Sequence, residues 1–169
     1  MLLNVQALLL LRKVNSHHLC LSSTVATNIL LYIDYFYKME LHLKITGILL
    51  IILALLHFLF PKYFKWKQEL CSLNIMNRQM MYVHSFFIAF VIFLMGLLCL
   101  TSATELTITT IGKRISLGLG IFWVTRLLIQ FFGYSSLLWK GKIFETSVHI
   151  FFSILWTYLS AVFILAYLA

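Results

Sequence analysis

Four long apolar runs dominate the chain and restrict it to folds that place helices in lipid. The runs cover about residues 43–60, 80–100, 115–134 and 147–168. An α-helix rises about 1.5 Å per residue, so about 20 residues cross the roughly 30 Å hydrocarbon core of a bilayer. The runs lack the strict alternation of a membrane-spanning strand, and unpaired backbone groups in lipid also favour helices. We therefore expect an all-α integral membrane protein, folded as an antiparallel four-helix bundle.

The composition supports a surface that faces lipid. Of the 169 residues, 62% are hydrophobic and 11% are charged, whereas a soluble domain carries about 25% charged residues. The net charge is +8, but the basic residues lie mostly in short connections between the runs, as is typical of topology signals and headgroup contacts. The expected partner is the lipid bilayer and not a nucleic acid. The sequence leaves open a partner membrane subunit or a homo-oligomer.

Two connections have a recognisable character. Between the first and second runs, Trp66, Leu70 and Leu73 recur at helical spacing among basic residues, which predicts a short helix lying in the membrane interface. The connection over residues 101–114 is rich in threonine, and we expect it to be partly extended.

Small residues mark one half of the predicted bundle as closely packed. Gly112, Ser116 and Gly120 recur every four residues, and Gly47 and Gly96 fall at the same level of an up-and-down bundle. Small side chains let helix backbones approach closely in lipid. The main interpretation is packing within one chain, and the alternative is a contact between copies of the chain. Cys99 lies in an apolar run, where it is expected to be a small core residue.

The N-terminal segment does not fit this plan. The apolar stretch over residues 2–11 precedes its basic residues, Arg12 and Lys13, whereas a secretory signal carries them first. We divide the chain into a poorly defined extension over residues 1–38, which we interpret as non-native, and a four-helix transmembrane domain over residues 39–169. The alternative is a genuine interfacial helix in the first segment.

The distribution of basic residues predicts the orientation. Counted from Met39, the first and third connections hold six basic residues: Lys62, Lys65, Lys67, Arg78, Lys140 and Lys142. The opposite side holds three: Lys44, Lys113 and Arg114. Basic loops stay in the cytoplasm. We therefore expect a cell inner membrane protein whose first and third connections are cytoplasmic, although the counts tie when residues 1–38 are included.

Polar residues gather at one end of the four runs. In an antiparallel bundle the same leaflet would hold six of them: His57, His84, Arg126, Gln130, Glu145 and His149. Arg78 enters the same region just before the second run. Ionisable groups within a membrane are costly and normally face the bundle interior, where they find partners. We therefore expect these residues to form one buried polar site.

Spacing along the helices adds detail to this site. Arg126 and Gln130 are four residues apart on one helix face, as are Glu145 and His149 on the next. A hairpin between these runs would bring the two faces together. Glu145 is the acidic residue nearest to Arg126 in this layer, so we expect the two side chains to be in contact, directly or through water.

Three interpretations of the polar site are possible. The first is a satisfied network that fixes the helix register. The second is a binding site for an anionic headgroup or a small anion, built on Arg126, Arg78 and the basic rim. The third is a haem or metal site on His57, His84 and His149, because imidazole suits zinc, copper and iron. The paired-histidine spacings typical of metal sites are not found in the sequence.

No catalytic motif identifies a reaction, so the sequence leaves enzymatic activity open. It has no nucleophile elbow, P-loop or glycine-rich dinucleotide turn. We predict a small multi-pass membrane protein with an accessory or ligand-binding role. The alternative is a redox membrane component that binds haem or a metal through its intramembrane histidines.

The division at residue 39 makes a testable prediction. Met39 opens a compact unit, Met-Glu-Leu-His-Leu-Lys, directly before the first run. If translation starts there, the intact mass of the protein from its native source matches residues 39–169. A native product that retains residues 1–38 contradicts the prediction.

Overall fold

The computed structural model describes residues 23–133 and 142–169, and all regular elements within these ranges are helices. The predicted all-α class is confirmed. By contacts the chain divides into two units, residues 1–35 and residues 36–169. In the first unit, residues 23–35 form the beginning of a helix that continues into the second. The expectations for residues 2–11, Tyr134, Trp139 and Lys140 lie outside the described residues.

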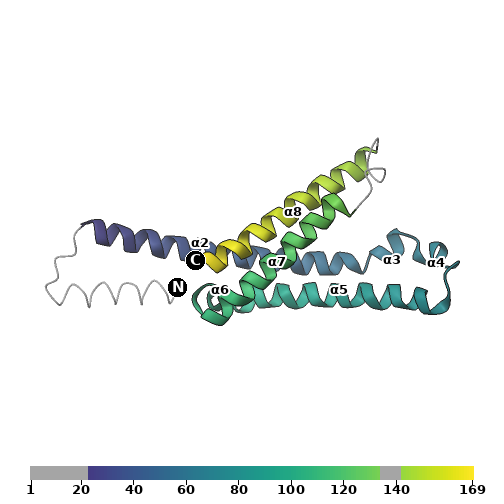
Figure 1. Ribbon diagram of the computed structural model, residues 1–169, viewed down its shortest axis with the longest axis horizontal. Helices are drawn as coiled ribbons and strands as arrows, with labels where there is room; N and C mark the ends of the chain where they lie inside the picture. Colours follow the sequence, from purple (N-terminus) through teal and green to yellow (C-terminus); the bar gives the residue numbers. More distant parts are fainter. Residues whose placement is uncertain (1–22, 134–141) are drawn as a thin grey trace. The chain divides into compact units, whose positions relative to one another are not determined.

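Four of the described helices are long and apolar enough to cross a membrane. They are α2 (Ser23–His57), α5 (Ile75–Thr101), α7 (Thr110–Phe132) and α8 (Ile143–Leu168), and α3 (Phe60–Tyr63), α4 (Trp66–Glu69) and α6 (Ala103–Ile108) lie between them (Figure 1). Large apolar side chains cover their outer faces, as Phe87 and Ile154 illustrate at 57% and 65% exposure. The four predicted spans are thus confirmed as helices of spanning length and composition.

Side-chain caps set where two of these helices begin. The Asn74 side chain accepts a hydrogen bond from the Asn77 backbone N–H at 2.8 Å, so α5 starts five residues before the predicted position. Thr109 caps α7 by accepting from the Gly112 N–H at 2.9 Å. The expectation of a partly extended second connection was largely wrong, because α6 occupies it and Thr109 alone is described as extended.

The first span ends earlier than predicted, at His57 and not at residue 60. Pro61 explains this end, because a proline ring clashes with the carbonyl four residues before it, here that of His57. The proline instead sits in the first turn of α3, where its missing N–H costs nothing. The predicted single interfacial helix is two separate turns, α3 and α4, because Lys65 adopts a left-handed conformation between them (φ 49°, ψ 40°).

Helices α2 and α5 pack through two glycines. A Cβ atom on Gly96 would lie 2.8 Å from Ile51 Cγ1 and 2.9 Å from the Gly47 carbonyl oxygen, and one on Gly47 would lie 2.9 Å from the Gly96 carbonyl oxygen. The backbones are therefore nearly in contact. Gly47 also approaches Leu100, whereas Gly96 approaches Ile51, so higher numbers on one helix meet lower numbers on the other and the pair is antiparallel.

The predicted ridge of small residues packs α7 against its neighbours within the chain. A Cβ atom on Gly112 would collide with the Glu105 carbonyl oxygen of α6. The buried Ser116 hydroxyl donates to the Leu106 carbonyl at 3.1 Å. Gly120 faces Ile164 of α8, which a Cβ atom would approach to 3.1 Å. The within-chain interpretation of the ridge is thus supported for all three positions.

One hydrophobic core joins these helices in residues 36–169. It takes residues from α2, α5, α6, α7 and α8, including Leu50, Cys99, Leu106, Trp123 and Phe163. Cys99 is fully buried, as expected of a core residue. His42 Nδ1 of α2 also lies 3.1 Å from the Tyr158 hydroxyl of α8. The two antiparallel pairs therefore share a core, although the buried residues of α5 begin only at Ala89.

The glycine contact predicts the outcome of a matched pair of substitutions. Gly96→Ala pushes α5 from the α2 backbone and is expected to lower the free energy of unfolding by about 1–3 kcal/mol. Gly118→Ala adds the same methyl group where nothing lies within 4 Å, so its stability is unchanged or slightly higher. Denaturant unfolding in detergent micelles measures both. Equal losses for the two variants contradict the packing described above.

Candidate functional site

Three of the predicted site residues contact one another, and all three lie on the antiparallel pair of α7 and α8: Arg126, Gln130 and His149. The two helices lie side by side in Figure 1, and residues that pair across them run in opposite directions. Trp123 stacks on Trp156, and Gln130 meets His149. Arg126 precedes the last residue of α7 by six positions, and His149 follows the first residue of α8 by six. At about 1.5 Å per residue, both lie roughly 9 Å inside their helix ends.

Arg126 is partly buried, and two of the residues that the structure describes, Gln130 and Trp156, hold it. Its Nη1 donates to the Gln130 Oε1 at 3.2 Å, as their spacing on one face predicts. Its Cζ lies 5.0 Å from the centre of the Trp156 ring, within range for a cation–π interaction. Gln130 is itself 7% exposed. The guanidinium is thus oriented by one amide and one aromatic face.

Trp156 is the centre of an aromatic stack. Its ring lies 5.0 Å from that of Trp123 at an interplanar angle of 15°, and 5.4 Å from that of Phe152 at 22°. Trp123 and Trp156 are 1% and 4% exposed. Neither indole N–H has a hydrogen-bond acceptor in the described part of the chain. The stack therefore provides a rigid, buried wall next to the Arg126 guanidinium.

His149 joins the same group from α8. Its Nε2 lies 3.4 Å from the Gln130 carbonyl oxygen, and because a carbonyl can only accept, Nε2 carries the proton in this contact. The edge of its ring meets Phe131 at 6.0 Å. We call Arg126, Gln130, His149 and Trp156 the α7/α8 polar cluster.

Three predicted site residues make no hydrogen bond, ion pair or ring contact with this cluster within the described ranges. Glu145 is exposed and forms no ion pair with Arg126 there, so the expected Arg126–Glu145 contact was wrong in its direct form. The first turn of α8 turns the Glu145 side chain outward. His84 is exposed and Arg78 is half-buried on α5.

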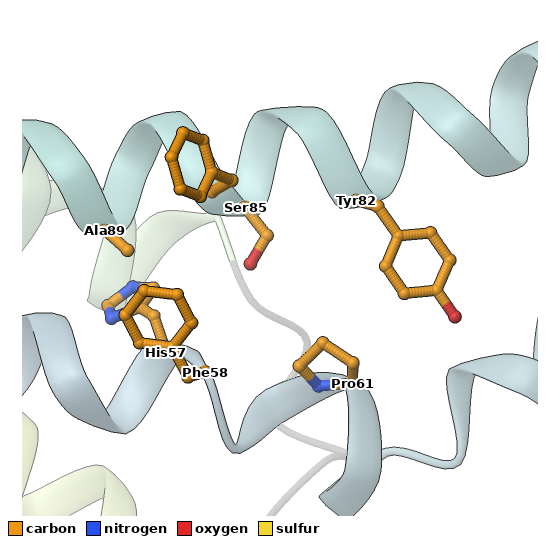
Figure 2. Close-up of a pocket in the computed structure, with 7 residues that line it drawn as sticks. His57, Phe58, Pro61, Tyr82, Ser85 and Ala89 are labelled. Carbon is orange, nitrogen blue, oxygen red and sulfur yellow. The ribbon is translucent and has the colours of Figure 1, made fainter.

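His57 lies in a groove of its own at the end of α2. Its Nδ1 lies 2.8 Å from the Leu53 carbonyl oxygen, and its ring packs on Phe60 at 4.7 Å. A cavity of about 170 Å³ separates it from α5 (Figure 2). The lining residues are His57, Phe58, Pro61, Tyr82, Ser85, Phe86 and Ala89. We call this the His57 groove, and no member of the α7/α8 polar cluster lines it.

The three histidines of the predicted metal site do not form a metal-binding group. Across residues 23–133 and 142–169, no three His, Cys, Asp or Glu side chains lie together in a way that could hold a metal ion. His57, His84 and His149 all fall within these ranges. The geometry therefore gives no support to a shared three-histidine site.

Two aromatic residues and one histidine were not anticipated from the sequence. Trp123 and Trp156 pack around the cluster. His42, which lies just before the first predicted run, forms a hydrogen bond with Tyr158. The helical spacing of the two tryptophans could have identified them from the sequence. Trp123 lies three residues before Arg126, and Trp156 lies seven after His149, so both share a face with a predicted site residue.

No protein-family model, curated protein or solved structure matches the chain. Its function is therefore inferred from the chemistry of its own side chains.

The Arg126–Trp156 contact predicts a measurable coupling. In a double-mutant cycle of Arg126→Met and Trp156→Leu, we expect a coupling free energy of about 0.5–2 kcal/mol, because each substitution alone already removes the cation–π contact. Unfolding in detergent micelles measures the cycle. Arg114→Met with Trp156→Leu is the matched control, because Arg114 is exposed at the other end of α7. A coupling no larger than in this control argues against the contact.

Proposed function

We propose that this chain is a small multi-pass membrane protein with an accessory, ligand-binding role, and that the α7/α8 polar cluster binds an anionic group. The observation that carries the proposal is the position of Arg126, held against Trp156 and Gln130 in a membrane-spanning helix. Guanidinium groups bind phosphate and carboxylate oxygens through paired hydrogen bonds. A lipid phosphate near the membrane surface fits this chemistry.

The charge distribution supports this role. This end of α5, α7 and α8 carries Lys62, Lys65, Lys67 and Lys142 in the connections and Arg78 in the first turn of α5. We place this end on the cytoplasmic side of a cell inner membrane, from the excess of basic residues in the first and third connections. Anionic lipids attract basic residues next to a membrane. The rim would concentrate anionic headgroups, and Arg126 would select one of them.

Lipid binding by the purified chain tests this function. Short-chain phosphatidylglycerol and phosphatidylcholine are titrated by calorimetry into the full chain in neutral detergent. We expect phosphatidylglycerol to bind more tightly, and Arg126→Gln to weaken its binding on the order of tenfold, since a charged hydrogen bond is lost. Arg114→Gln, which removes the same charge from the exposed start of α7, should bind like the unmodified chain.

Two results would contradict the proposal. One is equal binding of the two lipids. The other is an Arg126→Gln variant that is folded and binds phosphatidylglycerol as the unmodified chain does. If Arg126→Gln and His149→Ala instead abolish the folded protein, the cluster is a structural network that fixes the helix register.

The alternative function is a redox component that binds haem or a metal at His57, His84 and His149. The separation of these residues gives it less support than the anion site has. An absorption spectrum and a metal analysis of the detergent-purified chain distinguish the two functions. A Soret band or stoichiometric metal favours the redox component, and a colourless, metal-free protein removes it.

A further inference from the structure

The His57 groove contains polar atoms that have no hydrogen-bond partner among the residues that the structure describes. The Leu53 carbonyl accepts from His57 Nδ1, so Nδ1 carries the proton. In the neutral imidazole Nε2 is then a hydrogen-bond acceptor. Nε2 makes no hydrogen bond to any described residue. A free acceptor on a membrane-spanning helix is costly unless a ligand or water donates to it.

Ser85 adds a hydroxyl to the same groove. In the other helices, hydroxyls such as those of Thr125 and Ser153 donate to the carbonyl four residues earlier. Ser85 makes no such bond, and neither its hydroxyl nor that of Tyr82 has a hydrogen-bond partner among the described residues. Both side chains project from α5 toward the side on which His57 and Pro61 lie (Figure 2). The groove therefore offers the His57 acceptor and the Ser85 hydroxyl to an occupant, whereas the Tyr82 hydroxyl lies at the far end, beyond Pro61 (Figure 2).

The remaining walls define what this occupant can be. Phe58, Pro61, Phe86 and Ala89 are apolar, and none of the described residues that line the groove is charged, so an anionic headgroup is a poor fit. Aromatic walls favour a ring that packs in offset or edge contact. A bare acyl chain would leave His57 Nε2 and the Ser85 hydroxyl unpaired.

Volume narrows the choice further. A cavity of about 150 Å³ in a protein core holds one benzene molecule, and this groove has about 170 Å³ and is only half enclosed. It has room for one six-membered ring with a small substituent, and an attached tail can extend out of the groove into lipid. A phenolic hydroxyl can donate to His57 Nε2 and accept from the Ser85 hydroxyl at once.

We propose that the His57 groove is a binding site for an uncharged, hydroxylated aromatic ring of the phenol class, carried in the bilayer on an apolar tail. The ring lies between Phe58 and Phe86, and its hydroxyl donates to His57 Nε2. This site does not share residues with the α7/α8 polar cluster, so it does not depend on the proposed anion binding.

The test measures binding of para-hexylphenol to the full chain in nanodiscs of phosphatidylcholine, above its partition into empty nanodiscs. We expect saturable binding to one site per chain. Para-hexylanisole, which has a methyl ether in place of the hydroxyl, should bind about tenfold more weakly because it has no proton to donate. Arg126→Gln should leave both affinities unchanged, which separates this result from that of the anion site.

Matched variants locate the site. His57→Phe keeps an aromatic ring but removes the acceptor, and it should erase the preference for the phenol over the ether. His84→Phe is the control, because His84 is exposed on α5 and does not line the groove. If His57→Phe fails to fold, Ser85→Ala removes a hydroxyl without adding bulk and should weaken phenol binding alone.

Three outcomes would overturn the proposal. They are the absence of saturable phenol binding, equal binding of phenol and ether, and a phenol preference that survives in both folded His57→Phe and Ser85→Ala. The second outcome would mean that the groove is filled by any apolar group. The third would place the phenol site elsewhere in the chain.

Discussion

The near-contact of the Gly47 and Gly96 backbones is the constraint on which the rest of the packing depends. Lipid tails are as apolar as leucine side chains, so burial alone gives two helices no reason to associate in a membrane. Close approach supplies many weak dispersion contacts instead. Helices α2 and α5 gain these contacts at one level, and the ridge from Gly112 to Gly120 gives α7 the same advantage against α6 and α8. The closely packed half of the molecule is therefore built from its smallest residues.

The half of the α7/α8 pair away from the glycine ridge holds a guanidinium inside an apolar segment. A flat aromatic surface stabilises this charged group. Trp156 offers Arg126 a ring face, and Trp123 and Phe152 keep that ring in place. Gln130 then serves both helices, since its side chain accepts from Arg126 and its carbonyl from His149. This arrangement fixes the charge in direction as well as in depth, which is what recognition of an anion requires.

Run length and residue spacing were enough to predict the four helices, the burial of Cys99 and the grouping of Arg126 with Gln130. Helix ends were less predictable, because α5 and α7 begin at the side-chain caps Asn74 and Thr109 and not where hydropathy rises. The expected single polar site is seen only in part. Arg126, Gln130 and His149 come together, whereas His57 lies in a groove of its own. Position along a run gives the depth of a residue in the membrane, but the rotation of each helix decides which way a side chain points. The runs predict similar depths for His57 and His149, yet His57 is the last residue of α2 and lies in a groove of its own, whereas His149 lies six residues inside α8.

The bond between His42 and Tyr158 has a consequence for movement of α2. Gly47 lies on the side of this helix that packs against α5, and His42 lies on the side that contacts α8. Five residues separate the two positions, which corresponds to a rotation of about 140° around the helix axis. Rolling the segment in either direction would pull both residues from their partners together. The segment between them is thus held on two sides, against α5 and against α8.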